Sequence, residues 1–486
     1  MEAESLRVAM FSTMLGRGGA GYAALRVHDS LRLAGADCTL YVGGAERSRL
    51  PGVHRLSDAV EGIQPRRVPG LTIFSSDAPG IPKHTLDEII GKSDVFNLHW
   101  YARFLSLRNI ARLSWSGKPV VITVRDMNPL SGGCHFFHGC DNWQSDCAPC
   151  PQFIPDTIPL PGATLDAKKT LWNFDNITVV ALSDHTASLL QRSPLFAHCR
   201  VEKIPNPIDV SIFKPHDRSK ARATLGIPSD KHAIAYLPSF SSSVKGASQA
   251  IEALKCLSRD VPAADCVIIC AGDLEKPLDV PFETIDVGFI ADKHQLARYY
   301  SAVDVTLVPS TEETFSNTAA ESVACGTPVV GFQVGAVPEI AQGERGQAVP
   351  VGDIKALANA LRMMISDAGA RSEDLHRYVV ESFGAEAIGR RYLELFGELH
   401  RNGQACAASA CSKITHSSRL IQDFDRVLND FGSLRRGQLS EERQARRREM
   451  SSIRGCLNLI LRAVALFFTD NKAFRRQVQR LVEDGR

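Results

Sequence analysis

Two glutamates stand eight positions apart in PSTEETFSNTAAESVACGTPVVGF, the stretch from Pro309 to Phe332. The pattern predicts Glu313 on a loop after a strand, and Glu321 two turns into a helix that Gly326 ends. A carboxylate can accept two hydroxyl hydrogen bonds, which suits neighbouring hydroxyls on a sugar or a ribose. The N-terminus of the helix offers free N–H groups to a phosphate. Two glutamates at this spacing are, by themselves, typical of a solvated helix face, so the flanking residues carry the prediction.

A cysteine-rich stretch, SGGCHFFHGCDNWQSDCAPCPQ, occupies residues 131–152. Its cysteines are Cys134, Cys140, Cys147 and Cys150. Four thiolates would close a tetrahedral, structural zinc site, in which His135 or His138 could replace one cysteine. A structural thiol cluster and disulfides are the alternatives. Catalysis by one of these cysteines is not expected, because the sequence shows no activating partner.

Short apolar runs alternate with helical patterns along most of the chain. The runs of strand type in the first half are LRVAMFST (6–13), DCTLYVGG (37–44), DVFNLHW (94–100), KPVVITVRD (118–126) and ITVVALSD (177–184). Those in the second half are HAIAYLPS (232–239), DCVIICAGD (265–273), IDVGFI (285–290), DVTLVPS (304–310) and TPVVGF (327–332). Continuous apolar strands that alternate with helices indicate parallel α/β sheets.

The proline-rich stretch IPNPIDVSIFKP, residues 204–215, predicts a hinge between two such sheets. We therefore expect two doubly wound, Rossmann-like domains that face a cleft, with ligands at the carboxyl ends of the strands. The expected boundaries are residues 1–205, with the insertion 131–152, and residues 206–385. A terminal helix should follow over 386–400, and then a basic helical tail over 401–486.

The glutamate stretch resembles the signature of the retaining glycosyltransferases of the GT-B fold, family four: Glu, seven residues, Glu, and a helix that ends in ACGTPVV. Other matches occur in the same order as in that family. They are MLGRGGAGYAALRVHDSLRLAGAD, IPNPIDVSIFKP, VKGASQAIEAL (244–254), VGFIADKHQLARYYSAVDVTLVPS and VGAVPEI (334–340). The resemblance covers nearly all of residues 6–400. The cysteine-rich stretch is similar to an insertion found in a subgroup of bacterial polysaccharide-assembly transferases.

The resemblance implies a role for each matching residue, with a nucleotide-diphosphate sugar as the donor. Glu321 should bind the ribose hydroxyls, Glu313 the donor sugar, and Lys245 the diphosphate, as a point charge. The backbone near Gly288 should contact the base. The other residues that it places at the donor are Phe315, Ser316 and Asn317, together with Gly18 and Gly19, which let the chain approach closely because they lack side chains.

The resemblance also implies a reaction in which the protein mainly positions the reactants and stabilises charge, without a catalytic metal. The acceptor would be a saccharide or a lipid-linked compound, and the insertion would shape the acceptor side. His99 should lie at the cleft, with a histidine satisfied inside a loop as its alternative. Arg125 and Asp126 stand where the family often has His-Asp, and an arginine cannot act as a base. Because the loop SFSSSVKG offers only Lys245, a catalytically silent sugar-nucleotide-binding or scaffold protein is the alternative function.

Charge is unevenly distributed along the 486 residues. Residues 401–486 contain 17 Lys or Arg against 9 Asp or Glu, which leaves 39 and 45 in the rest, and the net charge is only +2. The whole chain therefore does not read as a nucleic-acid binder. Without a signal peptide or membrane span in the sequence, we expect a cytoplasmic protein. Its basic amphipathic tail suits an anionic membrane surface at the inner face of the membrane, and a helical pair packed on protein is the alternative.

Overall fold

The computed structural model describes residues 5–16, 18–44, 50–57, 68, 74–153, 160–237, 243–272, 277–366 and 372–406. The tail predicted for residues 401–486 lies outside the described residues from position 407 onward. Its helices and its role at a membrane therefore remain predictions. Among the described residues, no helix is both long enough and apolar enough to cross a bilayer.

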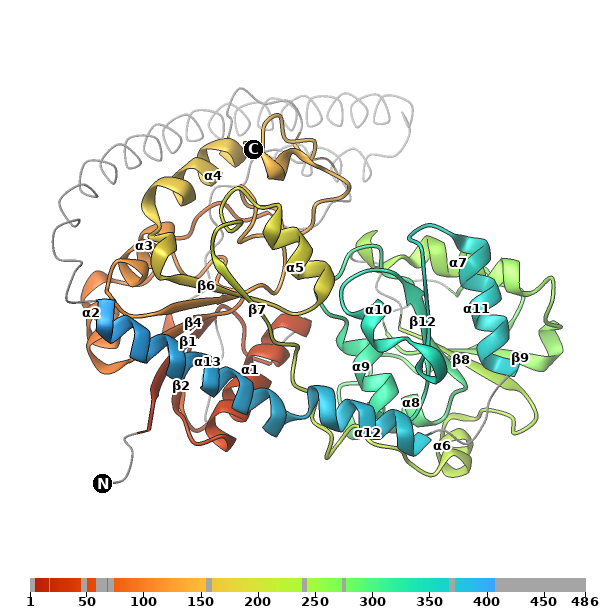
Figure 1. Cartoon of the computed structure of the whole chain (residues 1–486). Helices are drawn as coiled ribbons and strands as arrows, with labels where there is room; N and C mark the ends of the chain where they lie inside the picture. Colours follow the sequence, from red (N-terminus) through yellow and green to blue (C-terminus); the bar gives the residue numbers. More distant parts are fainter. Residues whose placement is uncertain are drawn as a thin grey trace, which may run out of the picture. The chain divides into compact units, whose positions relative to one another are not determined.

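The first sheet is parallel and, within the described part of the chain, has the strand order β3-β2-β1-β4-β5-β6-β7. Figure 1 labels β1, β2, β4, β6 and β7 of this sheet. Its strands are β1 (Arg7–Ser12), β2 (Asp37–Gly43), β3 (Val53–Ser57), β4 (Val95–Leu98), β5 (Val120–Thr123), β6 (Ile177–Ala181) and β7 (Arg200–Lys203). The helices between these strands are α1 (Gly18–Leu33), α2 (Lys83–Lys92), α3 (Leu107–Ser114), η1 (Asn142–Gln144), α4 (Leu160–Leu171), η2 (Phe174–Asn176) and α5 (Asp184–Gln191). We call this sheet and the helices that pack on it the N-terminal lobe.

The second sheet is also parallel and, again for the described residues, has the order β10-β9-β8-β11-β12-β13. Its strands are β8 (His232–Tyr236), β9 (Cys266–Cys270), β10 (Glu283–Asp286), β11 (Val305–Val308), β12 (Val329–Phe332) and β13 (Gly346–Val349). Its helices are α6 (Arg218–Leu225), η3 (Ser243–Lys245), α7 (Ala247–Leu257), η4 (Ala263–Asp265), α8 (Lys293–Ser301), α9 (Asn317–Ala324), α10 (Val337–Ile340), η5 (Gly343–Arg345), α11 (Ile354–Ser366) and α12 (Ser372–Phe383). We call this second sheet and its helices the C-terminal lobe.

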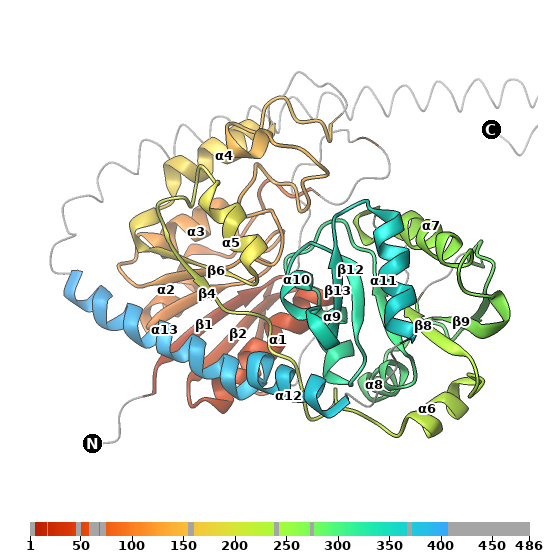
Figure 2. The ribbon, with the colours of Figure 1, turned by 45° about the vertical axis from the view of Figure 1, so that its right-hand side comes forward.

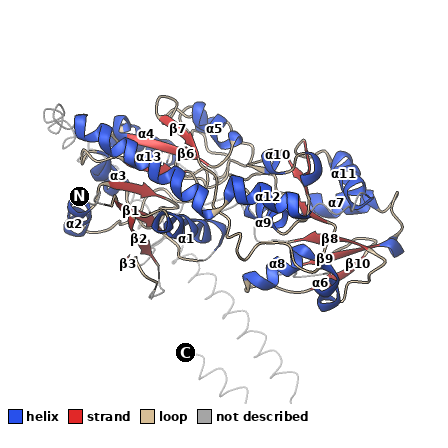
Figure 3. Ribbon diagram, turned by 60° about the horizontal axis from the view of Figure 1, so that its bottom comes forward, coloured by secondary structure: helices blue, strands red, loops and turns tan. Residues whose placement is uncertain are grey.

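Successive residues of the strands enter opposite cores, as a sheet covered on both faces requires. In β8, Ala233 and Ala235 join one apolar cluster with Val323 of α9. Ile234 and Tyr236 join another with Leu254 of α7. The predicted architecture of two doubly wound parallel sheets is confirmed. Figure 3 shows the strands of both sheets between their helices.

Three strands that the apolar runs did not predict are β3, β7 and β13, and each lies at the end of its sheet. Strand β7, with the sequence RVEK, has no fully buried residue. Strand β13, with the sequence GQAV, buries only its first and last residues. An edge strand is covered on fewer sides than a central one, so its sequence need not be continuously apolar.

Helix α13 (Ala385–Cys406) follows the C-terminal lobe in the sequence but packs on the N-terminal lobe (Figures 1 and 2). Its residues Ile388, Tyr392 and Phe396 are buried in one cluster with residues of β1 and α1. A Cβ atom on Gly389 would lie 2.2 Å from the carbonyl oxygen of Ser30, so this glycine permits close contact between α13 and α1. The chain therefore passes between the lobes twice, once after β7 and once before α13.

Candidate functional site

The predicted site residues follow the carboxyl ends of central strands in the two sheets. His99 comes directly after β4, and Arg125 and Asp126 come after β5. In the C-terminal lobe, Glu313 lies on the loop after β11, and Lys245 on the connection after β8. In doubly wound sheets this edge is where ligands bind, so the topology brings residues far apart in sequence to the same edge.

Lys245 and Glu313 form an ion pair in the C-terminal lobe: Lys245 Nζ donates to Glu313 Oε1. The hydroxyl of Ser310 donates to the same carboxylate oxygen at 3.1 Å. Gly246 makes this pair possible, because a Cβ atom there would lie 1.9 Å from the carbonyl oxygen of Pro309. Its φ of 70° is also a conformation that favours glycine. In the Lys-Gly sequence, the lysine therefore supplies the charge, and the glycine allows the close backbone contact with Pro309 that holds this lysine near Glu313.

The loop from Glu313 to α9 has an unusual backbone. Ser316 has φ = 90°, and its hydroxyl caps α9 by accepting the N–H of Ala319 at 3.4 Å. A non-glycine residue in this region is strained, and such strain is common at functional sites. Phe315 anchors the loop, since its buried ring packs edge-on against Phe383 with centroids 5.5 Å apart. The N-terminus of α9 therefore has a fixed position beside Glu313.

Glu321, on α9, pairs with a residue of the other lobe that the sequence did not single out. Arg26 Nη2 lies 2.7 Å from Glu321 Oε1, and the two side chains are only 10% and 11% exposed. The Arg26 guanidinium also lies 5.5 Å from the ring centroid of Phe213. In the described part of the chain, its Nε and Nη1 are buried without a hydrogen-bond partner. A buried carboxylate that already has a cationic partner is held in one orientation.

Asn317 and the glycine loop form a second contact between the lobes. Asn317 Nδ2 donates to the carbonyl oxygen of Gly19 at 3.4 Å, and its Oδ1 accepts from Asn206 Nδ2 at 3.0 Å. Gly18 has φ = 61° at the start of α1. The predicted donor residues Gly18, Gly19 and Asn317 thus lie together beside the N-terminus of α9.

Gly288, predicted to lie near the base, follows β10 with φ = 68°. Its N–H donates to Asp286 Oδ1 at 2.9 Å. The next side chain, Phe289, is 74% exposed. The predicted strand IDVGFI thus ends at Asp286, and the residues after it form a loop with an exposed ring.

Arg125 is buried and belongs to a network that joins the two lobes. Its Nε and Nη2 donate to His99 Nδ1 at 3.1 and 2.8 Å, and its Nη1 donates to Asn206 Oδ1. Its carbonyl oxygen accepts the hydroxyl of Thr314 at 3.0 Å. Burial lowers the pKa of Arg125 to about 10, which leaves it a cation at neutral pH.

His99 is held on both sides of its ring. Because Nδ1 accepts from Arg125, Nε2 carries the proton and donates to Asn97 Oδ1 at 2.5 Å. Burial, and secondarily the charge of Arg125, keep the pKa of His99 well below its usual value. The imidazole is therefore neutral with both nitrogens engaged. This is the geometry of a residue that positions Arg125, and a direct role for His99 in catalysis remains a prediction.

The side chain of Asp126 faces the cysteine-rich insertion. Its Oδ2 accepts from Trp100 Nε1 and lies 2.5 Å from His135 Nδ1, and its Oδ1 accepts the N–H of Asn128 at 2.9 Å. The other ring nitrogen of His135 lies 3.0 Å from the hydroxyl of Ser75. Both nitrogens of His135 thus have protein partners, which argues against this histidine as a zinc ligand.

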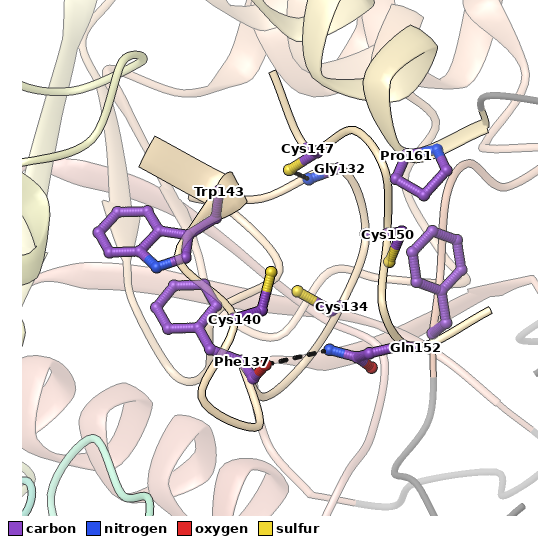
Figure 4. A pocket seen from close by; sticks show the side chains of 11 residues that line it. Gly132, Cys134, Phe137, Cys140, Trp143, Cys147, Cys150, Gln152 and Pro161 are labelled. Atoms are coloured by element: carbon purple, nitrogen blue, oxygen red, sulfur yellow. Dashed lines mark hydrogen bonds between the residues drawn. The ribbon is translucent and has the colours of Figure 1, made fainter. Parts of the chain in front are cut away.

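The four cysteines of the insertion line one small cavity of about 10 Å³ (Figure 4). All four are free thiols, so the disulfide alternative is wrong in this structure. Burial raises the pKa of Cys134, Cys147 and Cys150. Cys147 Sγ accepts the N–H of Gly132 at 3.2 Å. Within the described residues, no group of three or more His, Cys, Asp or Glu side chains is arranged to hold a metal ion. The arrangement therefore does not support the predicted zinc site.

Residues 231–367, which hold Lys245, Glu313 and Glu321, match the sequence family described as Glycosyl transferases group 1. This segment is similar to the group 1 glycosyl transferases. The relatives include D-inositol 3-phosphate glycosyltransferases. The one from Saccharomonospora viridis is 31% identical over 199 residues, which cover 38% of this chain and 46% of that protein. The one from Mycobacteroides abscessus is 29% identical over 187 residues, which cover 35% of this chain and 40% of that protein. The chain spans less than half the length of these relatives.

Solved structures share the fold of the two lobes together. Sucrose-phosphate synthase from Thermosynechococcus elongatus aligns with a TM-score of 0.55 and 20% identity, over 82% of this chain and 100% of that one. HepE from Anabaena, in complex with UDP-glucose, aligns with a TM-score of 0.56 and 17% identity, over 81% and 100%. At these identities the likeness establishes the fold, which is GT-B.

Two residues that join the lobes at the site were missed by sequence reasoning. Arg26 is one, because its partner Glu321 lies 295 positions away. Glu312 is the other: its carboxylate accepts the backbone N–H groups of Phe137 and His138, which belong to the insertion. No periodicity or spacing marks such pairs, although the position of Glu312 next to the motif residue Glu313 was a signal.

Proposed function

We propose that the chain is a retaining glycosyltransferase that moves a sugar from a nucleotide-diphosphate sugar to a saccharide or lipid-linked acceptor in polysaccharide or glycolipid biosynthesis. One observation carries the proposal. The Lys245–Glu313 pair stands beside the N-terminus of α9, with Glu321 on the same helix, in a segment that matches the group 1 glycosyl transferases. That combination offers a cation, free N–H groups and two carboxylates at one strand edge.

The chemistry follows from these groups. The bond between the anomeric carbon and the diphosphate oxygen breaks, and its electrons leave with the diphosphate. Lys245 and the N-terminus of α9 would stabilise that negative charge as it develops. Glu313 would hold donor-sugar hydroxyls, and Glu321, oriented by Arg26, would hold the ribose.

In a single step without a covalent intermediate, retention requires the acceptor oxygen to attack from the side that the diphosphate leaves. Its proton would then pass to a diphosphate oxygen, so that no protein base is needed. Two features support this route. Arg125 is a cation, and both ring nitrogens of His99 already have partners. The contribution of the protein would be the alignment of the two substrates and the fixed charges around them.

The proposal is tested by a transfer and donor-hydrolysis assay. UDP-glucose is the first donor to use, because a protein of the same fold was solved with it. Glu313→Ala should lower turnover by about a hundredfold or more, on the scale of a lost contact to the reacting groups. The matched control is Glu373→Ala, at an exposed glutamate of α12, which should leave turnover unchanged.

A thermal-shift screen of nucleotides separates the proposed enzyme from the alternative. A nucleotide at a hundredfold excess over its dissociation constant stabilises the folded protein by about 2.7 kcal/mol. Stabilisation without turnover across a broad donor and acceptor panel would refute catalysis, and a silent sugar-nucleotide-binding protein would stand instead.

We further propose that the tail docks on an anionic membrane surface, where a lipid-linked acceptor would lie. The support is the charge of residues 401–486, because each basic residue near such a surface contributes on the order of 1 kcal/mol. The full chain should sediment with anionic vesicles at low salt, and a chain truncated after Cys406 should not. Equal sedimentation of both chains, or dissociation of an oligomer on truncation, would refute membrane docking.

A further inference from the structure

The insertion of the N-terminal lobe is joined to the C-terminal lobe next to the predicted catalytic glutamate. Glu312 accepts the N–H of Phe137 at 2.8 Å and that of His138 at 2.6 Å. Hydrogen bonds to a carboxylate are stronger than those between neutral groups. The Phe137 ring is stacked on Trp143, with centroids 4.4 Å apart and planes 5° from parallel. The insertion therefore presents a rigid aromatic face at a fixed place beside the Glu313 loop.

A pocket of about 690 Å³ lies between this face, helix α5 and the loops of the C-terminal lobe. Its volume falls in the range of pockets that bind small organic molecules. Glu313, the partner of Lys245, is part of its wall. The residues predicted for the ribose and the base, Glu321 and Gly288, are not part of the wall. The pocket therefore reaches the reacting end of the site without being the nucleotide site.

The pocket wall combines aromatic rings with neutral and charged polar groups. Phe136 offers a half-buried ring, and its edge contacts His138 with centroids 6.4 Å apart. Burial lowers the pKa of His138 and of His185, so both imidazoles are neutral at neutral pH and can exchange hydrogen bonds with hydroxyls. Arg192 lies over the Trp143 ring at 5.6 Å. Rings beside neutral hydrogen-bonding groups suit a sugar, which has apolar ring faces and a rim of hydroxyls.

We propose that this pocket binds the terminal sugar of a saccharide acceptor, with the insertion and α5 as its walls and Glu313 at its reactive end. The inference rests on the proposed function and adds the acceptor class and its binding site. Transfer requires the acceptor oxygen within about 3–3.5 Å of the reacting carbon. A pocket that shares Glu313 with the proposed donor site would place the acceptor next to the donor sugar, and Glu312 joins the insertion to the C-terminal lobe at this pocket.

Binding is measured directly, by saturation-transfer NMR with the methyl glycosides of glucose, galactose and mannose as probes, in the presence of saturating UDP. At least one glycoside should bind saturably beside UDP. His185→Ala should weaken that binding roughly tenfold, the factor for a lost contact of about 1.4 kcal/mol. Phe136→Ala, on the opposite wall, should weaken it as well. The matched control His84→Ala, at an exposed histidine of α2 outside the pocket, should leave it unchanged.

Three results would overturn the inference: no glycoside binds, UDP displaces the glycoside, or His185→Ala and Phe136→Ala bind it like the wild type. Failure of the proposed function is recognised separately, by the absence of turnover across the donor and acceptor panel, with or without stabilisation by a nucleotide of the thermal-shift screen. The two variants lie on different elements, so the misfolding of one leaves the other decisive.

Discussion

The substitution Gly246→Ala would place a Cβ atom 1.9 Å from the carbonyl oxygen of Pro309 and 2.7 Å from its carbonyl carbon. These atoms are backbone at the end of β11, so they cannot rotate away as a side chain would. The N-terminus of α7 would have to move instead. Lys245 precedes this position, so its charge would move away from Glu313, and nucleotide binding should weaken.

The expected loss of stability has two parts. Alanine at φ = 70° costs about 1–2 kcal/mol, because the left-handed conformation crowds its Cβ. The contact with Pro309 adds about 1–3 kcal/mol, the usual cost of overpacking a well-packed region. Gly226 is a matched control, since it has the same φ of 70° but no atom within 4 Å of a built Cβ. Gly226→Ala should therefore show the first part alone.

Urea unfolding followed by circular dichroism would compare the two variants, and isothermal titration with UDP would compare their nucleotide sites. Gly246→Ala should lose about 1–3 kcal/mol more than Gly226→Ala. It should also bind UDP more weakly, whereas Gly226→Ala should bind it like the wild type. Equal stability losses, or unchanged UDP binding in Gly246→Ala, would show that the contact with Pro309 does not hold Lys245 in place.

Three further outcomes are expected. Arg26→Met should lower the free energy of unfolding by about 3–5 kcal/mol, because it leaves the buried carboxylate of Glu321 unpaired. The double variant Arg26→Met/Glu321→Leu should recover most of this loss. If urea unfolding showed that the losses of the two single variants add in the double variant, the prediction would be contradicted. Burial lowers the pKa of Lys168 to about 8, below that of a free lysine. Between pH 8 and the pKa of a free lysine, the unfolded chain binds more protons than the folded chain does. The unfolding free energy of the wild type relative to that of Lys168→Met should therefore rise with pH in this range, and a fall would refute the lowered pKa of Lys168. Cys134, a buried thiol with a raised pKa, should resist iodoacetamide in the native protein and react in urea, as read by mass spectrometry. If a chelator made it reactive, the four thiols would hold a metal after all.

The central strands of each sheet were predictable from the sequence, whereas three of the four end strands of the described sheets were not. A strand such as β9, with the sequence CVIIC, is buried on both faces and must be continuously apolar. The strands β3, β7 and β13 lie at edges, where partial exposure removes that requirement. Apolar patterning therefore predicted the buried central strands and missed three partly exposed strands at the ends of the sheets.

The candidate site divides in the same way. Glu313, Glu321 and Lys245 were found because a short local motif carries them. Arg26 and Glu312 were missed because each acts across the two lobes, through a partner 295 or about 175 positions away. Such pairs depend on how complete lobes meet, and nothing in one sequence reports that contact. The four cysteines of the insertion show the opposite kind of error. Their spacing in the sequence predicted a metal site, but the described side chains do not form one.

The return of α13 to the N-terminal lobe has a consequence for how the protein is made. A ribosome releases residues 5–204 first, yet the core of that lobe also needs Ile388, Tyr392 and Phe396. The lobe synthesised first can therefore be completed only after the second has emerged, although domains commonly fold in order of synthesis. Until then, the apolar faces of β1 and α1 that receive this helix are exposed. Premature termination within residues 231–367 would leave an incomplete N-terminal lobe, with these faces open to chaperones and to aggregation.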